Sequence, residues 1–259
     1  MNIKILNQSE NKVEFSLEGI NHVIANTLRR LVINEVPTLA IEEVDMKENS
    51  SAMYDEMLAH RLGLVPLTTD LKSYDMKQNC KCEGKGCASC TLKLKLQAKG
   101  PCIVYSGDIK SSDPKVKPVF DKMPLVKLLK DQEVELEATA VLGNGNMHAK
   151  FQPGLIFFKG YPQFTIKGGN EELARTCPVN ILEFDGKKVK VTDETKCTLC
   201  MACQDHDSEA IQVRGSDKDF IFTLESWGQL DCKEILLKAM DMFDSYLNEF
   251  EKQLKKLNF

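Results

Sequence analysis

The sequence has no long hydrophobic run and no segment that resembles a targeting signal. Its longest apolar stretches, such as Leu155 to Phe158, are far too short to cross a bilayer. The first ten residues are polar throughout and lack the apolar centre of a leader. These absences argue against a membrane protein and predict a soluble chain in the cytoplasm.

A surplus of basic residues is also missing. The chain has 34 Lys and Arg against 38 Asp and Glu, so its formal net charge at pH 7 is −4. A protein that binds nucleic acid by itself usually carries a basic surplus, because neutralising phosphates supplies most of its affinity. Nor are basic residues interleaved with aromatic ones, as in single-strand binders. The composition therefore disfavours a zinc-dependent nucleic-acid-binding module, and we expect contact with DNA only through partners.

Cysteine, by contrast, is abundant. Without a secretory segment, the ten cysteines do not predict a disulfide framework, because clustered thiols in a reducing compartment more often bind metal. Eight of them fall into two spaced groups. Cys102 and Cys232 stand alone, and we expect each to be a small buried residue.

The first group places four cysteines within eleven residues, at Cys80, Cys82, Cys87 and Cys90. Glycines between them relax the turn, and four thiolates can close a tetrahedron around one Zn²⁺. No open coordination position is suggested, so we expect one structural Zn²⁺ that fixes a loop. Four unmetallated thiols and an iron–sulfur cluster are the alternatives.

The second group is Cys197, Cys200 and Cys203, with Cys177-Pro178 twenty residues upstream of the first of them. Bacterial-type ferredoxins carry the run C-x2-C-x2-C-x3-C-P, in which the fourth cysteine binds the other cluster. The triplet therefore matches one such run that has lost its fourth cysteine. Cys177-Pro178 matches a second run that has kept only its fourth cysteine and the proline that follows it.

The positions of the lost ligands complete this comparison. The fourth-cysteine position after the triplet is Asp207, and the three positions before Cys177 are Lys167, Asn170 and Leu173. The four remaining cysteines add up to one whole cluster site, whereas every ligand of the other site is gone. We expect one [4Fe-4S] cluster, or a [3Fe-4S] cluster, with zinc as the alternative; His206 is expected to be solvated.

Hydrophobic periodicity predicts both strands and helices. Helices are expected at residues 20–35 and 55–62 and at the end of the chain, with a hairpin turning at Asp185-Gly186. Residues 110–117 and 143–146 are expected to be loops. Strands are expected at residues 3–6, 13–17, 40–46, 92–97, 134–142, 155–158, 181–184, 188–191 and 220–224.

The terminal helix carries an apolar stripe with alternating steps of four and three residues. Such a stripe suits a helix packed lengthwise against another helix. It fits either a helix docked on its own domain or an interface with a second subunit. The residues of the stripe are Leu236, Met240, Phe243, Leu247, Phe250, Leu254 and Leu257.

Three segments together resemble the RNA polymerase alpha family, which includes its archaeal member, known as D, and the eukaryotic third-largest subunit. They are residues 26–30 up to Pro37, Ala40-Ile41, and residues 55–67. Glu225-Ser226-Trp227-Gly228 is similar to that family's last strand and turn. The two cysteine groups occupy the places that the archaeal branch reserves for a zinc loop and a ferredoxin-like insert.

The resemblance implies an α+β fold with a discontinuous layout. An alpha-like dimerisation domain would comprise residues 1–47, 158–167 and 220–259. An inserted, mostly-β domain at 48–157 would carry the zinc loop at 80–90, and a ferredoxin-like iron–sulfur insert would span 168–219.

The resemblance also implies partners. The first and terminal helices would pair with a small alpha-like subunit, L, through residues such as Leu28 and Leu31 and the terminal stripe. Subunits N and P and the large catalytic subunits would then dock on this pair. Arg29 and Arg30 match an arginine pair that contacts a large subunit in the family, although a solvated helix face is the alternative.

The implied function is a non-catalytic assembly platform of DNA-directed RNA polymerase. Nothing in the chain resembles the metal-binding aspartate loop of the large subunits, so no catalytic residue is expected and nucleotidyl transfer belongs to the complex. The alternative is a ferredoxin-like electron carrier or redox sensor. One cluster on a small insert argues against a dedicated carrier, because a cluster also staples a domain too small to bury much core.

Overall fold

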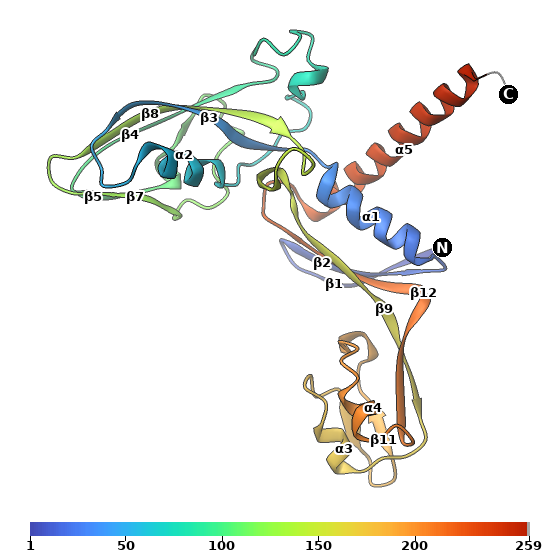
Figure 1. Cartoon of the computed structure of the whole chain (residues 1–259). Coiled ribbons are helices and arrows are strands. Elements are labelled where there is room, and N and C mark those ends of the chain that lie inside the picture. The colour runs from blue at the N-terminus through green and yellow to red at the C-terminus, as the bar shows by residue number, and fades with distance from the viewer. Residues whose placement is uncertain (258–259) are drawn as a thin grey trace. The chain divides into compact units, whose positions relative to one another are not determined.

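The computed structural model describes residues 1–257. The chain forms two compact units, each made of segments far apart in the sequence (Figure 1). Unit 1 comprises Met1–Arg29 and Ile156–Leu224, and unit 2 comprises Arg30–Leu155 and the residues from Glu225 onward. No described helix is long and apolar enough to cross a membrane.

Unit 1 is built on a four-stranded sheet in the order β1-β2-β12-β9. Its strands are β1 (Asn2–Gln8), β2 (Lys12–Glu18), β9 (Gly154–Ile166) and β12 (Ile211–Ser226). Aromatic side chains hold the middle of this sheet together. Phe15 stacks on Phe222 with ring centroids 5.2 Å apart, and Phe158 meets Phe220 edge-on at 5.6 Å. The helix α1 (His22–Asn34) begins in this unit, where Asn21 Oδ1 accepts a hydrogen bond from the backbone N–H of Ile24.

The segment between β9 and β12 forms a small subdomain with its own core (Figure 1). Two short helices, α3 (Glu171–Arg175) and α4 (Ala202–His206), accompany the hairpin of β10 (Leu182–Phe184) and β11 (Val189–Val191). A 3-10 turn, η4 (Glu194–Lys196), precedes the cysteine triplet. The hairpin lies where the Asp185-Gly186 turn predicts it, with Gly186 at a φ of 88°.

Unit 2 contains a second sheet in the order β3-β8-β4-β6. Side chains along β4 alternate strictly between buried and exposed over most of its length, which is the pattern of a sheet with one face on a core. Leu58 and Leu62 of the helix α2 are fully buried in that core. The strands of this sheet are β3 (Thr38–Asn49), β4 (Leu92–Lys99), β6 (Lys110–Ser111) and β8 (Glu133–Gly143). A separate two-stranded sheet pairs β5 (Cys102–Tyr105) with β7 (Pro124–Leu128). The unit also contains the helix α2 (Asp55–Gly63) and the 3-10 turns η1 (Lys77–Asn79), η2 (Ser106–Asp108) and η3 (Ala149–Phe151).

The last element of unit 2 is the long helix α5 (Cys232–Lys256). Only Cys232, Ile235 and Ala239 are buried among its described residues, all in its first third. Tyr246, further along, donates a hydrogen bond to the Glu35 carboxylate, and this contact raises the pKa of Tyr246 to about 12. The remainder of α5 thus exposes its side chains on every face.

Some expectations from the sequence are wrong. Cys102, expected to be buried, is exposed at the start of β5, with its Sγ within 3.5 Å of the Lys99 carbonyl oxygen. The loop expected at residues 110–117 begins with the short strand β6. Cys232 is buried, as expected.

Candidate metal centres and exposed interface surfaces

The loop that carries the first cysteine group is shaped by tight backbone turns. The N–H of Glu83 donates to the Cys80 carbonyl oxygen at 3.0 Å, and the N–H of Lys85 donates to that of Cys82 at 3.1 Å. Gly84 and Gly86 have φ angles of 79° and 86°, in the region that favours glycine. The chain therefore reverses twice within a few residues and brings distant cysteines together.

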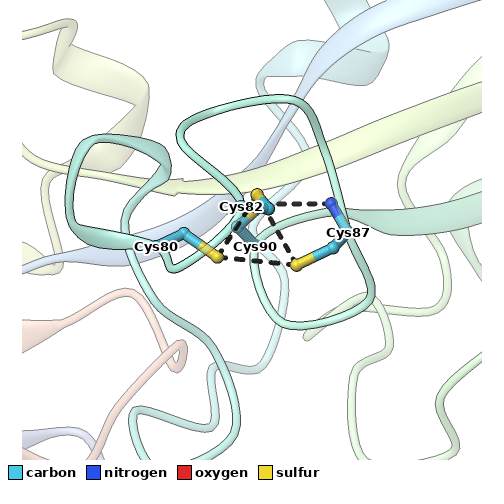
Figure 2. A group of neighbouring side chains, drawn as sticks. All are labelled: Cys80, Cys82, Cys87 and Cys90. Atoms are coloured by element: carbon cyan, nitrogen blue, oxygen red, sulfur yellow. Dashed lines mark hydrogen bonds between the residues drawn. The ribbon is translucent and has the colours of Figure 1, made fainter.

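The sulfur atoms of this group converge on a common centre (Figure 2). The Sγ atom of Cys80 lies 3.4 Å from that of Cys82 and 3.5 Å from that of Cys87. Cys90 Sγ lies 3.5 Å from that of Cys82 and 3.9 Å from that of Cys87. Ligands of a tetrahedral zinc ion, each about 2.3 Å from the metal, stand about 3.8 Å apart. The four thiols are thus arranged as the ligands of one metal ion, and their soft sulfur donors suit zinc or iron.

Because the four thiols lie so close together, hydrogen bonds between them shift their pKa values in different directions. The hydrogen bond between the sulfur atoms of Cys82 and Cys80 lowers the pKa of Cys82 to about 6. The backbone N–H of Cys82 lowers the pKa of Cys80, but shared protons with Cys82 and Cys87 outweigh this effect and raise it to about 12. Burial raises the pKa of Cys90. A bound cation would replace those shared protons, so thiolate formation and metal binding are coupled at this loop.

The second group gathers around one small, mainly apolar pocket in the subdomain of unit 1. Cys177 follows α3, Cys197 follows η4, and Cys203 lies within α4. These three are buried, whereas Cys200 is exposed. All four cysteines line the pocket, together with Phe164, Pro178, Val179, Ile181, Leu182, Thr198, Met201 and Val213.

The backbone of the triplet is bent at two non-glycine residues. Leu199 and Met201 have φ angles of 55° and 64°, which costs about 1 kcal/mol or more for each. The Leu199 N–H points at Cys197 Sγ, 3.4 Å away, as a donor to a thiolate would. Burial raises the pKa values of Cys197 and Cys203. A positively charged metal group in the pocket would offset the cost of ionising these buried thiols, so the four cysteines fit a metal ion or cluster.

The two groups are gathered in different ways. Within the described residues, the group at Cys80 is the one whose four ligand atoms all lie within 4.8 Å of one another. The four cysteines of the second group share the lining of one mainly apolar pocket.

The positions of the lost ferredoxin ligands now have structural roles. Leu173 is buried in the subdomain core, and Asn170 Oδ1 accepts a hydrogen bond from the Leu173 N–H at 2.8 Å to begin α3. Asp207 Oδ1 accepts hydrogen bonds from the N–H groups of Glu209 and Ala210 at 3.1 and 2.9 Å. His206 is exposed. These positions therefore contribute one apolar core side chain and two turn caps.

The interface residues expected on α1 lie in different environments. Arg29 is half-buried, and its Nε and Nη2 atoms donate to Asn26 Oδ1 at 3.1 and 2.9 Å, whereas Arg30 is exposed. Leu28 is half-buried and Leu31 is buried. Unit 1 also has exposed apolar side chains on β1 and α1, among them Ile3, Ile5, Val23 and Ile24.

Most side chains of the stripe on α5 are exposed to solvent. Leu236 is half-buried, but the residues that follow it along the stripe are between 37% and 63% exposed. They are Met240, Phe243, Leu247, Phe250, Leu254 and Leu257. A continuous row of this kind is unusual on the surface of a monomer and is typical of an interaction surface.

Comparison with known proteins identifies the family. Residues 39–157 match the model of the RNA polymerase Rpb3/RpoA insert domain. The chain is 40% identical over 255 residues to DNA-directed RNA polymerase subunit Rpo3 of Methanosphaera stadtmanae, which covers 93% of this chain and 94% of that relative. It is 41% identical over 250 residues to the subunit Rpo3 of Methanothermobacter thermautotrophicus, with 93% and 94% covered. The chain therefore belongs to the Rpo3 family of DNA-directed RNA polymerase subunits, which unites the archaeal D and eukaryotic Rpb3 proteins.

Proposed function

We propose that this chain, a non-catalytic assembly subunit of DNA-directed RNA polymerase, acts as a platform whose exposed apolar surfaces are covered by other subunits. The observation that carries the proposal is the exposed stripe on α5. Burial of a large apolar side chain stabilises an assembly by about 1.5–3 kcal/mol, so several in a row supply a strong interface. Unit 1 offers a second such surface, at Ile3, Ile5, Val23 and Ile24.

The first partner that we propose is the small alpha-like subunit, L. It would pair with α1 and α5 through Leu28, Leu31 and the stripe, including Leu236, Met240, Phe243, Leu247 and Phe250. The subunits N and P and the large catalytic subunits would then dock on the pair, with Arg29 and Arg30 facing a large subunit. The chain would reach DNA only through the complex, and the cytoplasm is the location that fits this role.

The two metal centres are proposed as structural supports of the platform. The spacing of Cys80, Cys82, Cys87 and Cys90 favours one Zn²⁺. The ferredoxin-like spacing of Cys177, Cys197, Cys200 and Cys203, which all line one apolar pocket, favours one [4Fe-4S] cluster, or a [3Fe-4S] cluster. The relatives are polymerase subunits, so electron transfer or redox sensing as the main function has no support.

A three-part layout goes with this function. We propose a dimerisation domain of residues 1–47, 158–167 and 220–259. The inserted domain at 48–157 would carry the zinc loop, and residues 168–219 would form the iron–sulfur insert.

Co-purification with the tagged small subunit tests the proposal. Leu247→Asp places a charge in the stripe and should weaken the complex by at least about 100-fold, because a buried unpaired carboxylate costs several kcal/mol. The matched control is Lys252→Asp, which introduces the same side chain on the opposite face of α5 and should bind like the unmodified chain. Equal binding by both variants would refute the assignment of the stripe as an interface.

A further inference from the structure

One partly buried cation lies directly behind the cysteine triplet of unit 1. Lys159 of β9 is half-buried, and its Nζ donates hydrogen bonds to the carbonyl oxygens of Thr195 and Cys197 at 2.7 and 2.6 Å. Both carbonyls belong to the short segment that delivers Cys197 to the pocket. Lys159 therefore joins a strand of the main sheet to the ligand loop.

The segment is already shaped to present these carbonyls. Asp193 begins the η4 turn by accepting hydrogen bonds from the N–H and hydroxyl of Thr195 at 3.0 and 2.6 Å. The Cys197 N–H donates to the Glu194 carbonyl oxygen at 3.1 Å and closes the turn. The two carbonyls that accept from Lys159 are thus fixed by the turn before the triplet begins.

A close apolar contact fixes the other side of the loop. A Cβ atom on Gly215 of β12 would lie 3.2 Å from Leu199 Cδ1, so the triplet loop packs tightly over this strand. Gly160, next to Lys159, would place a Cβ 2.7 Å from the Ser216 carbonyl oxygen. The loop is therefore held to the β9–β12 pair by one charged contact and one apolar contact.

The charge of Lys159 suits a set of thiolate ligands. The ammonium group lies within hydrogen-bond distance of the backbone of Cys197, and the thiol of Cys197 lines the apolar pocket. Four thiolates around an iron–sulfur group carry net negative charge, so an ammonium group behind one ligand offsets part of the cost of placing that charge in an apolar pocket.

We propose that Lys159 is a positioning residue that holds the ligand Cys197 in place and stabilises the negative charge of the ligand set. This inference rests on the iron–sulfur assignment proposed above. Removal of the ammonium group should release the two carbonyls, loosen the loop and make the reduced state of the bound group less favourable.

Three variants separate the contact from general effects of substitution. Lys159→Met keeps the length of the side chain without its charge, and Lys159→Arg keeps both charge and donors. Lys196→Met is the matched control, because Lys196 is an exposed lysine of the same turn. Each full-length chain is purified without oxygen, and iron content, the rate of bleaching near ~400 nm in air and the midpoint potential are measured.

The expected result is specific to Lys159→Met. Its absorbance should bleach about tenfold faster than that of the unmodified chain, as outer-shell substitutions weaken metal binding by about 10–100-fold. Its midpoint potential should be more negative. Lys159→Arg should restore both values, and Lys196→Met should leave both unchanged. Unchanged bleaching and potential in Lys159→Met would overturn the proposal.

A second measurement keeps this inference distinct from the cluster assignment. If the unmodified chain contains no iron, the iron–sulfur assignment fails. Amide hydrogen exchange at residues 195–199 of the metal-free chain then tests the contact alone. Exchange several-fold faster in Lys159→Met than in Lys196→Met, on the order of fivefold, would support the positioning role. Equal exchange would refute it.

Discussion

Cys90 has no exposed surface, whereas Cys82 and Cys87 of the same group are half-buried. Its Sγ also accepts a hydrogen bond from the Cys87 N–H at 3.3 Å, so it anchors the loop from the core side. Loss of this thiol would therefore leave the loop, and the zinc ion that we propose it binds, without their innermost support.

The first prediction concerns this ligand. Cys90→Ser should abolish binding of the metal ion, because three thiolates and a hydroxyl bind zinc far more weakly than four thiolates do. Metal analysis should show the loss of about one zinc ion per chain, and residues 77–91 should become sensitive to protease. Cys102→Ser is the control, since Cys102 is exposed and outside both groups. Unchanged zinc content in Cys90→Ser would contradict the site.

Tyr74 gives unit 2 a specific dependence on alkaline pH. Its hydroxyl donates to Asp113 Oδ2 at 2.8 Å. Burial, together with that carboxylate, raises the pKa of Tyr74 from 10.0 to about 12. Because the folded-state pKa is raised, the resulting stabilisation is complete below pH 10 and is lost as the pH rises to about 12.

The second prediction follows from the raised pKa of Tyr74. Between about pH 8 and about pH 11, the chain should lose on the order of 1 kcal/mol of unfolding free energy that Tyr74→Phe does not lose. Denaturant titrations of both chains at the two pH values measure the difference, in which the titration of all other groups cancels. A difference that stays constant with pH would show that Tyr74 ionises equally in the folded and unfolded chain.

At the scale of single residues, the grouping of the cysteines could be predicted from the sequence, whereas the burial of a lone cysteine could not. Their spacing alone grouped Cys80 with Cys82, Cys87 and Cys90, because four cysteines on one short loop cannot lie far from one another in space. Spacing gives no information about which way a lone cysteine points, which explains the wrong expectation for Cys102. The contact of Lys159 with the triplet could not be predicted either, because it joins residues 36 and 38 positions apart.

Among the elements, α5 consists of two segments of different character. Its first third buries Ile235 and Ala239 completely, whereas Leu247 is 49% exposed further along. The buried residues belong to the folding of this chain, and the exposed ones do not. A mutation should therefore affect either stability or assembly, according to its position on the helix.

The third prediction uses this separation. Ile235→Ala should reduce the unfolding free energy of the isolated chain by about 2–4 kcal/mol, because it leaves a cavity in the core. Leu247→Asp should change it by less than about 0.5 kcal/mol, as is usual for surface positions. Denaturant unfolding of the isolated chain, at concentrations below those at which it self-associates, compares the two. Comparable destabilisation by both would mean that the stripe packs within this chain.

Elements with a clear hydrophobic periodicity were predicted, whereas strands that depend on pairing with a distant strand were not. The helices α1 and α2 lie within two residues of their expected ranges. The strand β12, however, extends over Ile211–Ser226, well beyond the expected 220–224. Its first half reads as polar, and it is extended because it pairs with β9. The strands β5 and β7 were missed for the same reason, since each is short and is stabilised by the other.

On the scale of the whole molecule, each unit is assembled from segments far apart in the sequence. Local patterns cannot reveal such an arrangement, and the expectation of a discontinuous layout came from the resemblance to the alpha family. That resemblance is confirmed over nearly the whole chain by relatives of 35–41% identity. The relatives establish membership of a family of polymerase subunits. The exposed apolar side chains are the surfaces that we propose other subunits cover.

Sedimentation of the purified chain, alone and with the small alpha-like subunit, tests the central claim most directly. A chain whose exposed stripe is an interface should self-associate or aggregate alone and form a stable one-to-one complex with that subunit, with a dissociation constant below about 1 μM. A well-behaved monomer whose sedimentation is unchanged by the small subunit would contradict the account.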